Sequence, residues 1–192
     1  MRIRKSDKAG AKKPEVKIDL QAMDGRMALS NPVCSPDCQK FHASACSAHC
    51  SDAPALLSSD PAYPVEVAVA PLVFALKQMG VFDPCWSCEG HYDTSGNLWK
   101  LPRVWFYADS VVHVRVLSHA IKDMFHKGRI SHNWEVSVTH SDDNNLATTF
   151  SLQPVLADGE NSLGSLHRDI EAITQNLHAF VRKQVNLLQE NL

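Results

Sequence analysis

The sequence predicts one α+β domain: a small, mainly antiparallel sheet packed with helices, a Cys-rich metal-binding lobe before it and a long C-terminal helix. Three observations lead to this prediction. The centre of the chain reads as strand, helix and hairpin, the C-terminal region carries a regular apolar seam, and all six cysteines lie in two short segments. A chain of 192 residues is long enough for one sizeable core and short for two complete domains.

The first strongly apolar segment, Val65–Met79, has helical spacing and ends at Gly80, a residue suited to a helix C-terminus. Pro71 interrupts it, because proline lacks the backbone donor that a helix interior requires. The segment therefore predicts a helix that is kinked at Pro71 or begins there. Farther along, the β-branched and aromatic run 103–107 predicts a strand.

Asp109 or Ser110 follows this strand and is suited to cap a helix that runs to about Lys127. Apolar and polar residues then alternate over 134–139, as in a half-buried strand. A polar turn follows, and 147–152 predicts the returning strand of a hairpin. This order of elements favours an antiparallel sheet.

The C-terminal segment 165–189 predicts one long amphipathic helix. Its seam has spacings of 3, 4, 3, 4 and 3 and then drifts around the helix, as a period of 3.6 residues requires; the members are Leu163, Leu166, Ile170, Ile173, Leu177 and Phe180, followed by Val181, Val185 and Leu188. A drifting seam favours a place in the core. Pairing of two such helices in a homodimer is the alternative.

Charge divides the chain into a basic tail and an acidic body. Residues 1–17 hold seven Lys or Arg and two acids, a charge of +5, so the other 175 residues carry −7 of the net −2. The sequence predicts a disordered arm over 1–28, the Cys-rich lobe over 29–60 and the α+β domain over 61–192. Nucleic acid is not expected to bind the acidic body, although the arm could attract it.

The basic tail lacks the continuous apolar segment of a secretory signal, and the sequence has no apolar run long enough to span a membrane. A cytoplasmic location without membrane attachment is therefore expected. Cysteines are reduced in that compartment, so closely spaced thiols indicate metal or redox chemistry before disulfides. The first cysteine group repeats at intervals of four and consists of Cys34, Cys38, His42, Cys46 and Cys50. Two helical turns that each present C-x3-C could enclose one tetrahedral zinc ion. An iron-sulfur cluster, copper or paired disulfides are the alternatives.

The second group lies in the turn-like stretch 84–93, where Cys85, Cys88 and His91 form C-x2-C-x2-H. Two cysteines at this spacing often supply half of a tetrahedral zinc site, and His91 is near enough to be a third ligand. Glu89 and Asp93 flank these ligands. A carboxylate beside a zinc ion with three protein ligands could activate water, so both are candidate catalytic residues.

The metal ligands predicted from sequence are therefore Cys34, Cys38, His42, Cys46, Cys50, Cys85, Cys88 and His91. In the leading hypothesis, zinc joins the two groups and creates a binding surface for a protein partner or a small ligand. In the second hypothesis the zinc at Cys85, Cys88 and His91 keeps an open position, and the protein is an enzyme. A metal carrier, an iron-sulfur protein or a thiol redox protein is the third.

Overall fold

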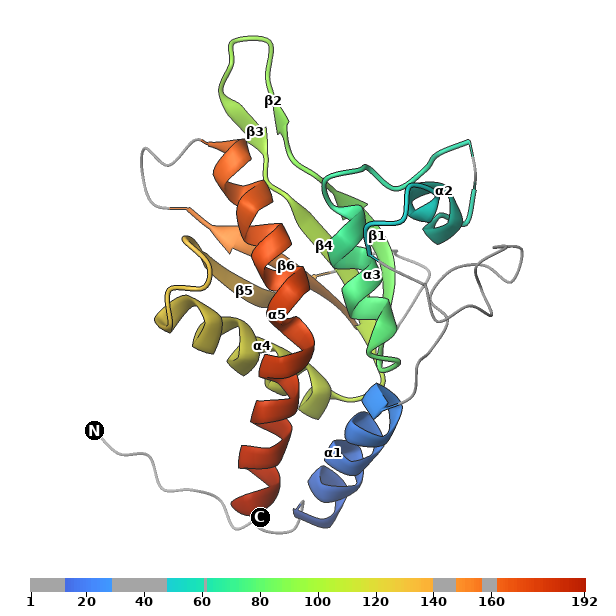
Figure 1. Cartoon of the computed structure of the whole chain (residues 1–192), viewed down its shortest axis with the longest axis vertical. Helices are drawn as coiled ribbons and strands as arrows, with labels where there is room; N and C mark the ends of the chain where they lie inside the picture. The colour runs from blue at the N-terminus through green and yellow to red at the C-terminus, as the bar shows by residue number, and fades with distance from the viewer. Residues whose placement is uncertain (1–12, 29–47, 61, 140–147, 157–161) are drawn as a thin grey trace.

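The structure, a computed structural model, describes residues 13–28, 48–60, 62–139, 148–156 and 162–192. It is an α+β fold in which helices pack on one face of a four-stranded antiparallel sheet (Figure 1). The helices are α1 (Lys13–Ala28), α2 (Ala53–Leu57), α3 (Ala70–Gln78), α4 (Val111–His126) and α5 (Leu163–Glu190). The strands are β1 (Phe82–Cys88), β2 (His91–Tyr92), β3 (Leu98–Lys100), β4 (Arg103–Ala108), β5 (Asn133–Thr139) and β6 (Thr149–Val155). The predicted antiparallel sheet and long C-terminal helix are confirmed.

The sheet has the order β1-β4-β6-β5, and each neighbouring pair is antiparallel. Helix α4 carries the chain from β4 across β6 to β5, so β4 and β5 run in the same direction with β6 between them. Side chains alternate across the strands. One face therefore buries Val104, Phe106 and Leu152 completely beneath the helices, while the other carries Trp105 and the half-exposed Trp86, whose rings lie 4.7 Å apart.

Helices α4 and α5 form the main cover of the sheet. Ser110 caps α4 by accepting a hydrogen bond from the Val112 N–H, one of the two caps predicted. The predicted seam of α5 is buried, with the drift expected from its period; its buried members are Leu166, Ile170, Ile173, Leu177, Val181 and Val185. The seam is thus core within one chain, the first of the two alternatives, and a homodimer through the C-terminal helix remains a prediction.

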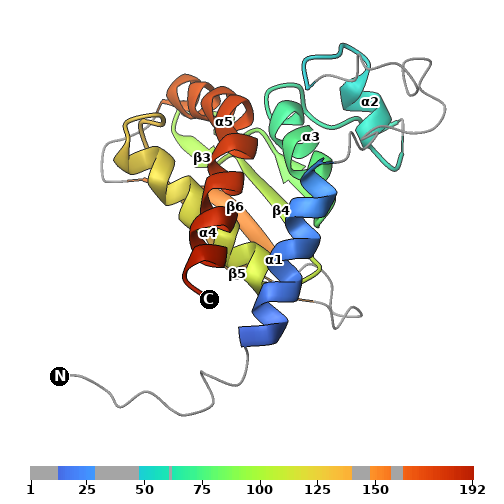
Figure 2. The same ribbon diagram turned by 60° about the horizontal axis from the view of Figure 1, so that its bottom comes forward.

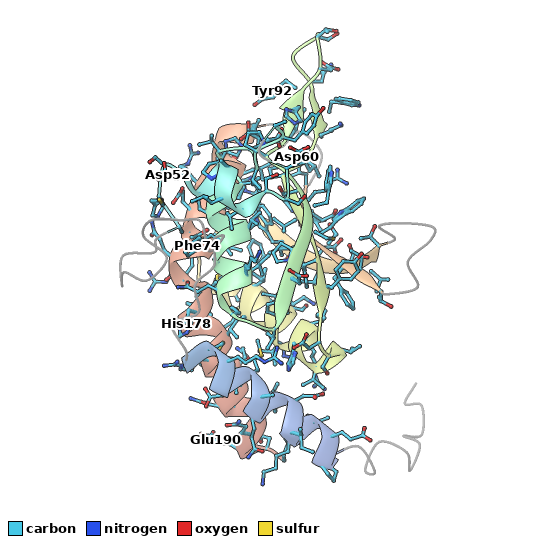
Figure 3. The ribbon with its side chains drawn as sticks, turned by 90° about the vertical axis from the view of Figure 1, so that its right-hand side faces the viewer. Asp52, Asp60, Phe74, Tyr92, His178 and Glu190 are labelled. Carbon is cyan, nitrogen blue, oxygen red and sulfur yellow. The ribbon has the colours of Figure 1, made fainter. Side chains whose placement is uncertain are left out.

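Helix α1 replaces part of the predicted disordered arm. The prediction fails for residues 13–28, because they form a helix that buries Leu20, Met23 and Met27. Figure 2 shows this helix lying beside α5 and α4. Polar contacts hold it there: His178 of α5 lies with its Nε2 3.2 Å from the Met27 carbonyl oxygen, and the Ser110 hydroxyl donates to the Asp19 carboxylate at 2.6 Å. Figure 3 labels His178 at the level of this contact.

Two elements differ from the predicted boundaries around the second cysteine group. Helix α3 begins at Ala70 with Pro71 in its first turn, which is the second of the two alternatives, and Gly80 follows it with φ of 70°. The segment 65–69 before it is not helical: 65–66 have no regular structure and 67–69 form a turn. Residues 84–88, predicted as turn, belong to strand β1 and pair with β4.

The link between β1 and β4 extends beyond the main sheet. Strands β2 and β3 form a two-stranded arm that protrudes from the body (Figure 1), with Tyr92 labelled on it in Figure 3. The chain leaves the main sheet at Cys88 and returns at Arg103, which are register partners. None of the described helices is both long enough and apolar enough to cross a membrane.

Candidate metal centre

Three potential metal ligands converge at the base of the protruding arm. Cys88 ends β1, His91 begins β2, and Glu66 lies in the turn before α3. One ligand atom from each, the Cys88 Sγ, a His91 ring nitrogen and a Glu66 carboxylate oxygen, lie within 4.8 Å of one another. Across the described ranges, this is the one group of three such residues with that proximity.

Hydrogen bonds between two chain segments position the Glu66 carboxylate. Its Oε1 lies 3.0 Å from His91 Nε2, and its Oε2 accepts the Glu89 N–H at 2.6 Å. In return, the Glu89 carboxylate accepts the Ala68 N–H at 2.9 Å. These reciprocal contacts join 66–68 to 88–91 and hold the Glu66 and His91 side chains close together.

The thiol of Cys88 lies in an environment that suits a metal ligand. The residue is only 4% exposed, and the Gly90 N–H points at its Sγ from 3.4 Å. This contact fixes the orientation of the sulfur beside the other two candidate ligand atoms. His91 and Glu66 are each about two-fifths exposed. The candidate centre therefore has a buried sulfur side and a side open to solvent.

The separations fit a small tetrahedral ion with modest adjustment. Zinc bonds of about 2.0 Å to oxygen or nitrogen and about 2.3 Å to sulfur require ligand atoms roughly 3.3 to 3.6 Å apart. The His91–Glu66 contact of 3.0 Å would have to widen slightly, and the longest separation, within 4.8 Å, would have to shorten. The His91 and Glu66 side chains, which would make these changes, are both partly exposed.

Gly90 allows the chain to turn between Cys88 and His91. Its φ is 91°, a conformation that other residues rarely adopt, and a Cβ there would lie 2.6 Å from Leu163 Cδ1, 2.9 Å from Pro102 Cδ and 3.1 Å from the Lys100 carbonyl oxygen. The N-terminus of α5 packs on the same turn. The Leu163 N–H donates to the Tyr92 hydroxyl at 2.9 Å, and His167 Nε2 lies 2.7 Å from the Glu89 carbonyl oxygen.

Replacing Gly90 with alanine should therefore damage both the fold and the metal centre. The added methyl group meets a backbone oxygen and a proline ring as well as a flexible leucine, so the 88–91 turn must shift. We expect a loss of about 1 to 3 kcal/mol in the free energy of unfolding, measured by denaturant titration of the metal-free protein. Gly96→Ala is the matched control, because Gly96 also has a positive φ but open space around its Cα. Equal losses in the two variants would contradict the role of close packing at Gly90.

Cys85 lies outside the three-residue group, although the C-x2-C spacing suggested that it would join Cys88, and its role as a metal ligand remains a prediction. Cys85 lies at a bulge in β1, between the Pro84 and Trp86 register positions. Partial burial of the thiol, with a contribution from the Asp83 carboxylate, raises the pKa of Cys85 above its ordinary value. A thiol of raised pKa is protonated at neutral pH and is a poorer ligand.

The two candidate catalytic carboxylates have structural contacts. Asp93 lies in the turn of the arm, where its Oδ1 accepts the N–H groups of Ser95 and Asn97, each at 2.8 Å. The hydrogen bond from the Asn97 backbone N–H is the main reason why the pKa of Asp93 lies below its ordinary value. Neither Asp93 nor Glu89 belongs to the three-residue group, and a catalytic role for either remains a prediction.

The upstream ligands lie mostly outside the described residues. These are Cys34, Cys38, His42 and Cys46, and their predicted part in metal binding remains a prediction. Cys50 is described and half-buried, just before α2.

Sequence reasoning missed Glu66, which lies 22 positions before Cys88 in no recognisable spacing. One signal was available: it is the only charged residue in the apolar run 64–76.

Comparison with known proteins identifies no relative. No protein-family profile matches the chain, and neither does any curated protein or solved structure. The function must therefore be argued from the centre itself.

Proposed function

We propose that this chain is a metal-binding protein and that Glu66, Cys88 and His91 hold its ion. The convergence of a sulfur, a nitrogen and an oxygen ligand within 4.8 Å is the observation that supports this proposal. The hydrogen bonds that position Glu66 and the backbone donor on Cys88 add to it, because metal ligands are commonly oriented by such outer contacts.

Zinc is the ion that these ligands fit best. Zinc binds thiolate, imidazole and carboxylate ligands and usually holds four ligands in a tetrahedron. An iron-sulfur cluster requires about four thiolates, and the described group offers only that of Cys88. Copper(I) favours several sulfur ligands, so one thiolate among harder ligands suits it less.

The three candidate ligands among the described residues leave a fourth position on a tetrahedral ion, and we propose that a molecule from outside the chain binds there. The two partly exposed protein ligands place it toward solvent. Large aromatic side chains next to the ligands in sequence are also exposed: Tyr92 at 47%, and Trp86 at 44%. Such rings offer contact area to a bound molecule or protein partner. The metal would then supply one bond and the aromatic surface the remaining contacts.

The alternative function is a zinc-dependent enzyme. The observation that favours an enzyme is the number of candidate ligands in the described group, which is three. Catalytic zinc sites typically have three protein ligands and one open position. A water in the open position would be the nucleophile. Glu89 would act as its base through the carboxylate oxygen that does not accept the Ala68 N–H.

Cobalt substitution tests the open position. The full-length chain, stripped of metal and loaded with Co²⁺, should show a thiolate-to-cobalt absorption band that is absent from Cys88→Ser. Added azide should change the visible spectrum, because it replaces a solvent ligand. If the thiolate-to-cobalt band is present but azide does not change the spectrum, the protein itself fills the fourth position. That result would refute an open site. Absence of the band would refute the centre itself.

A further inference from the structure

A serine, a histidine and an aspartate form a second chemical cluster at the N-terminus of α5. Ser165 and Asp169 are one turn apart on this helix, and His132 comes from the loop before β5. His132 Nδ1 lies 2.8 Å from Asp169 Oδ2, and His132 Nε2 lies 3.5 Å from Ser165 Oγ. We propose that these three residues are a catalytic triad for acyl transfer, independent of the metal centre.

The Asp169 carboxylate fixes the orientation of the histidine. Its side chain is 3% exposed, and it accepts the N–H groups of Ser131 at 2.7 Å and His132 at 2.9 Å, as well as the indole N–H of Trp134 at 3.3 Å. A carboxylate can only accept, so the neutral imidazole carries its proton on Nδ1 and presents the Nε2 lone pair to Ser165. The imidazole, 10% exposed, is thereby held as the base that a serine nucleophile requires.

The serine is the accessible member of the cluster. Ser165 is half-buried, and its hydroxyl now donates to the Ser162 carbonyl oxygen at 2.7 Å. Rotation of that hydroxyl hydrogen and an approach of about half an ångström would form the bond to His132, an adjustment common when a substrate binds. Gly164 beside it has no side chain, and the Arg168 Nη1 lies 4.0 Å from where a Cβ would be. The Arg168 guanidinium therefore lies close to the residue before the proposed nucleophile.

The reaction would be hydrolysis of a carboxylic ester. Ser165 Oγ attacks the carbonyl carbon while its proton passes to His132 Nε2. His132 returns this proton to the leaving alcohol oxygen as the carbon–oxygen bond breaks, which leaves an acyl group on Ser165. Water then attacks the acyl carbon with His132 as base, releasing the acid and restoring the hydroxyl.

Covalent labelling and ester hydrolysis test this proposal on the full-length chain. A fluorophosphonate should form an adduct on Ser165, located by peptide mass spectrometry, and the chain should release p-nitrophenol from p-nitrophenyl acetate. Ser165→Ala and His132→Gln should each lower that hydrolysis by about 100-fold or more. Labelling of Ser165 should disappear in His132→Gln. Ser118→Ala, a half-buried serine on α4, is the control variant and should behave as wild type.

Two outcomes would overturn the proposal. One is the absence of an adduct on Ser165 with hydrolysis unchanged in Ser165→Ala, which would leave the cluster as a brace between α5 and the 131–134 loop. The other is loss of all activity on metal chelation with the fold intact, which would assign the chemistry to the metal centre. Melting temperatures of the variants show whether each remains folded.

Discussion

Replacing Cys88 with serine should lower the zinc affinity of this protein by at least about 100-fold. Loss of an outer-sphere partner alone costs about 10- to 100-fold in metal affinity, and Cys88 supplies the only sulfur of the described group. A serine hydroxyl is a far weaker zinc ligand than a thiolate. Competition against a chromophoric chelator measures the change.

Cys85→Ser is the matched control for this substitution. Cys85 lies three positions earlier on the same strand but outside the three-residue group, so its replacement should leave zinc affinity unchanged. An equal fall in both variants would restore the C-x2-C ligand pair indicated by the spacing. An unchanged affinity in Cys88→Ser would refute the proposed centre.

Replacing Leu20 with alanine should destabilise the protein by about 2 to 5 kcal/mol. The side chain is fully buried in the main core, where removal of three carbon atoms loses burial and leaves a cavity. A truncation in a solvated arm, which the composition of this segment suggests, would leave the stability almost unchanged. Urea unfolding, read by circular dichroism, measures the free energy change.

Ile18→Ala on the same helix is the comparison. Ile18 is 63% exposed, so its truncation should change stability by no more than about 0.5 kcal/mol. If Leu20→Ala is equally neutral, α1 does not pack on α4 and α5 as the structure shows. The prediction of a disordered arm over 1–28 would then be correct.

Local patterns predicted most of the body of the fold. The Ser110 cap, the apolar face of α4 and the drifting seam of α5 each depend on neighbours within a few turns, so the sequence displays them directly. Helix α1 was missed because its stability comes from elsewhere. Its exposed positions mix charged residues with apolar ones such as Ile18, so the sequence shows no clear apolar face. The three buried residues, Leu20, Met23 and Met27, gain their stabilisation from α4 and α5 far along the chain.

The candidate centre was predicted in part for the same reason. Cys88 and His91 are neighbours in sequence and were found by spacing, whereas Glu66 approaches only because the turn before α3 packs against the end of β1. Cys85 was included because C-x2-C was taken as a turn. A strand with a bulge places that residue differently. Spacing could not reveal the Ser165, His132 and Asp169 cluster, since the fold alone brings His132 to the helix that carries the other two.

Metal content tests the central claim most directly. The full-length protein, purified without added metal or chelator, should contain zinc by elemental analysis, and Cys88 should react faster with a thiol reagent after chelation than before. Peptide mass spectrometry separates Cys88 from the other five cysteines. Bound zinc and a Cys88 thiol that reacts faster after chelation are the expected results. Protein without metal, in which Cys88 reacts at the same rate before and after chelation, would contradict it.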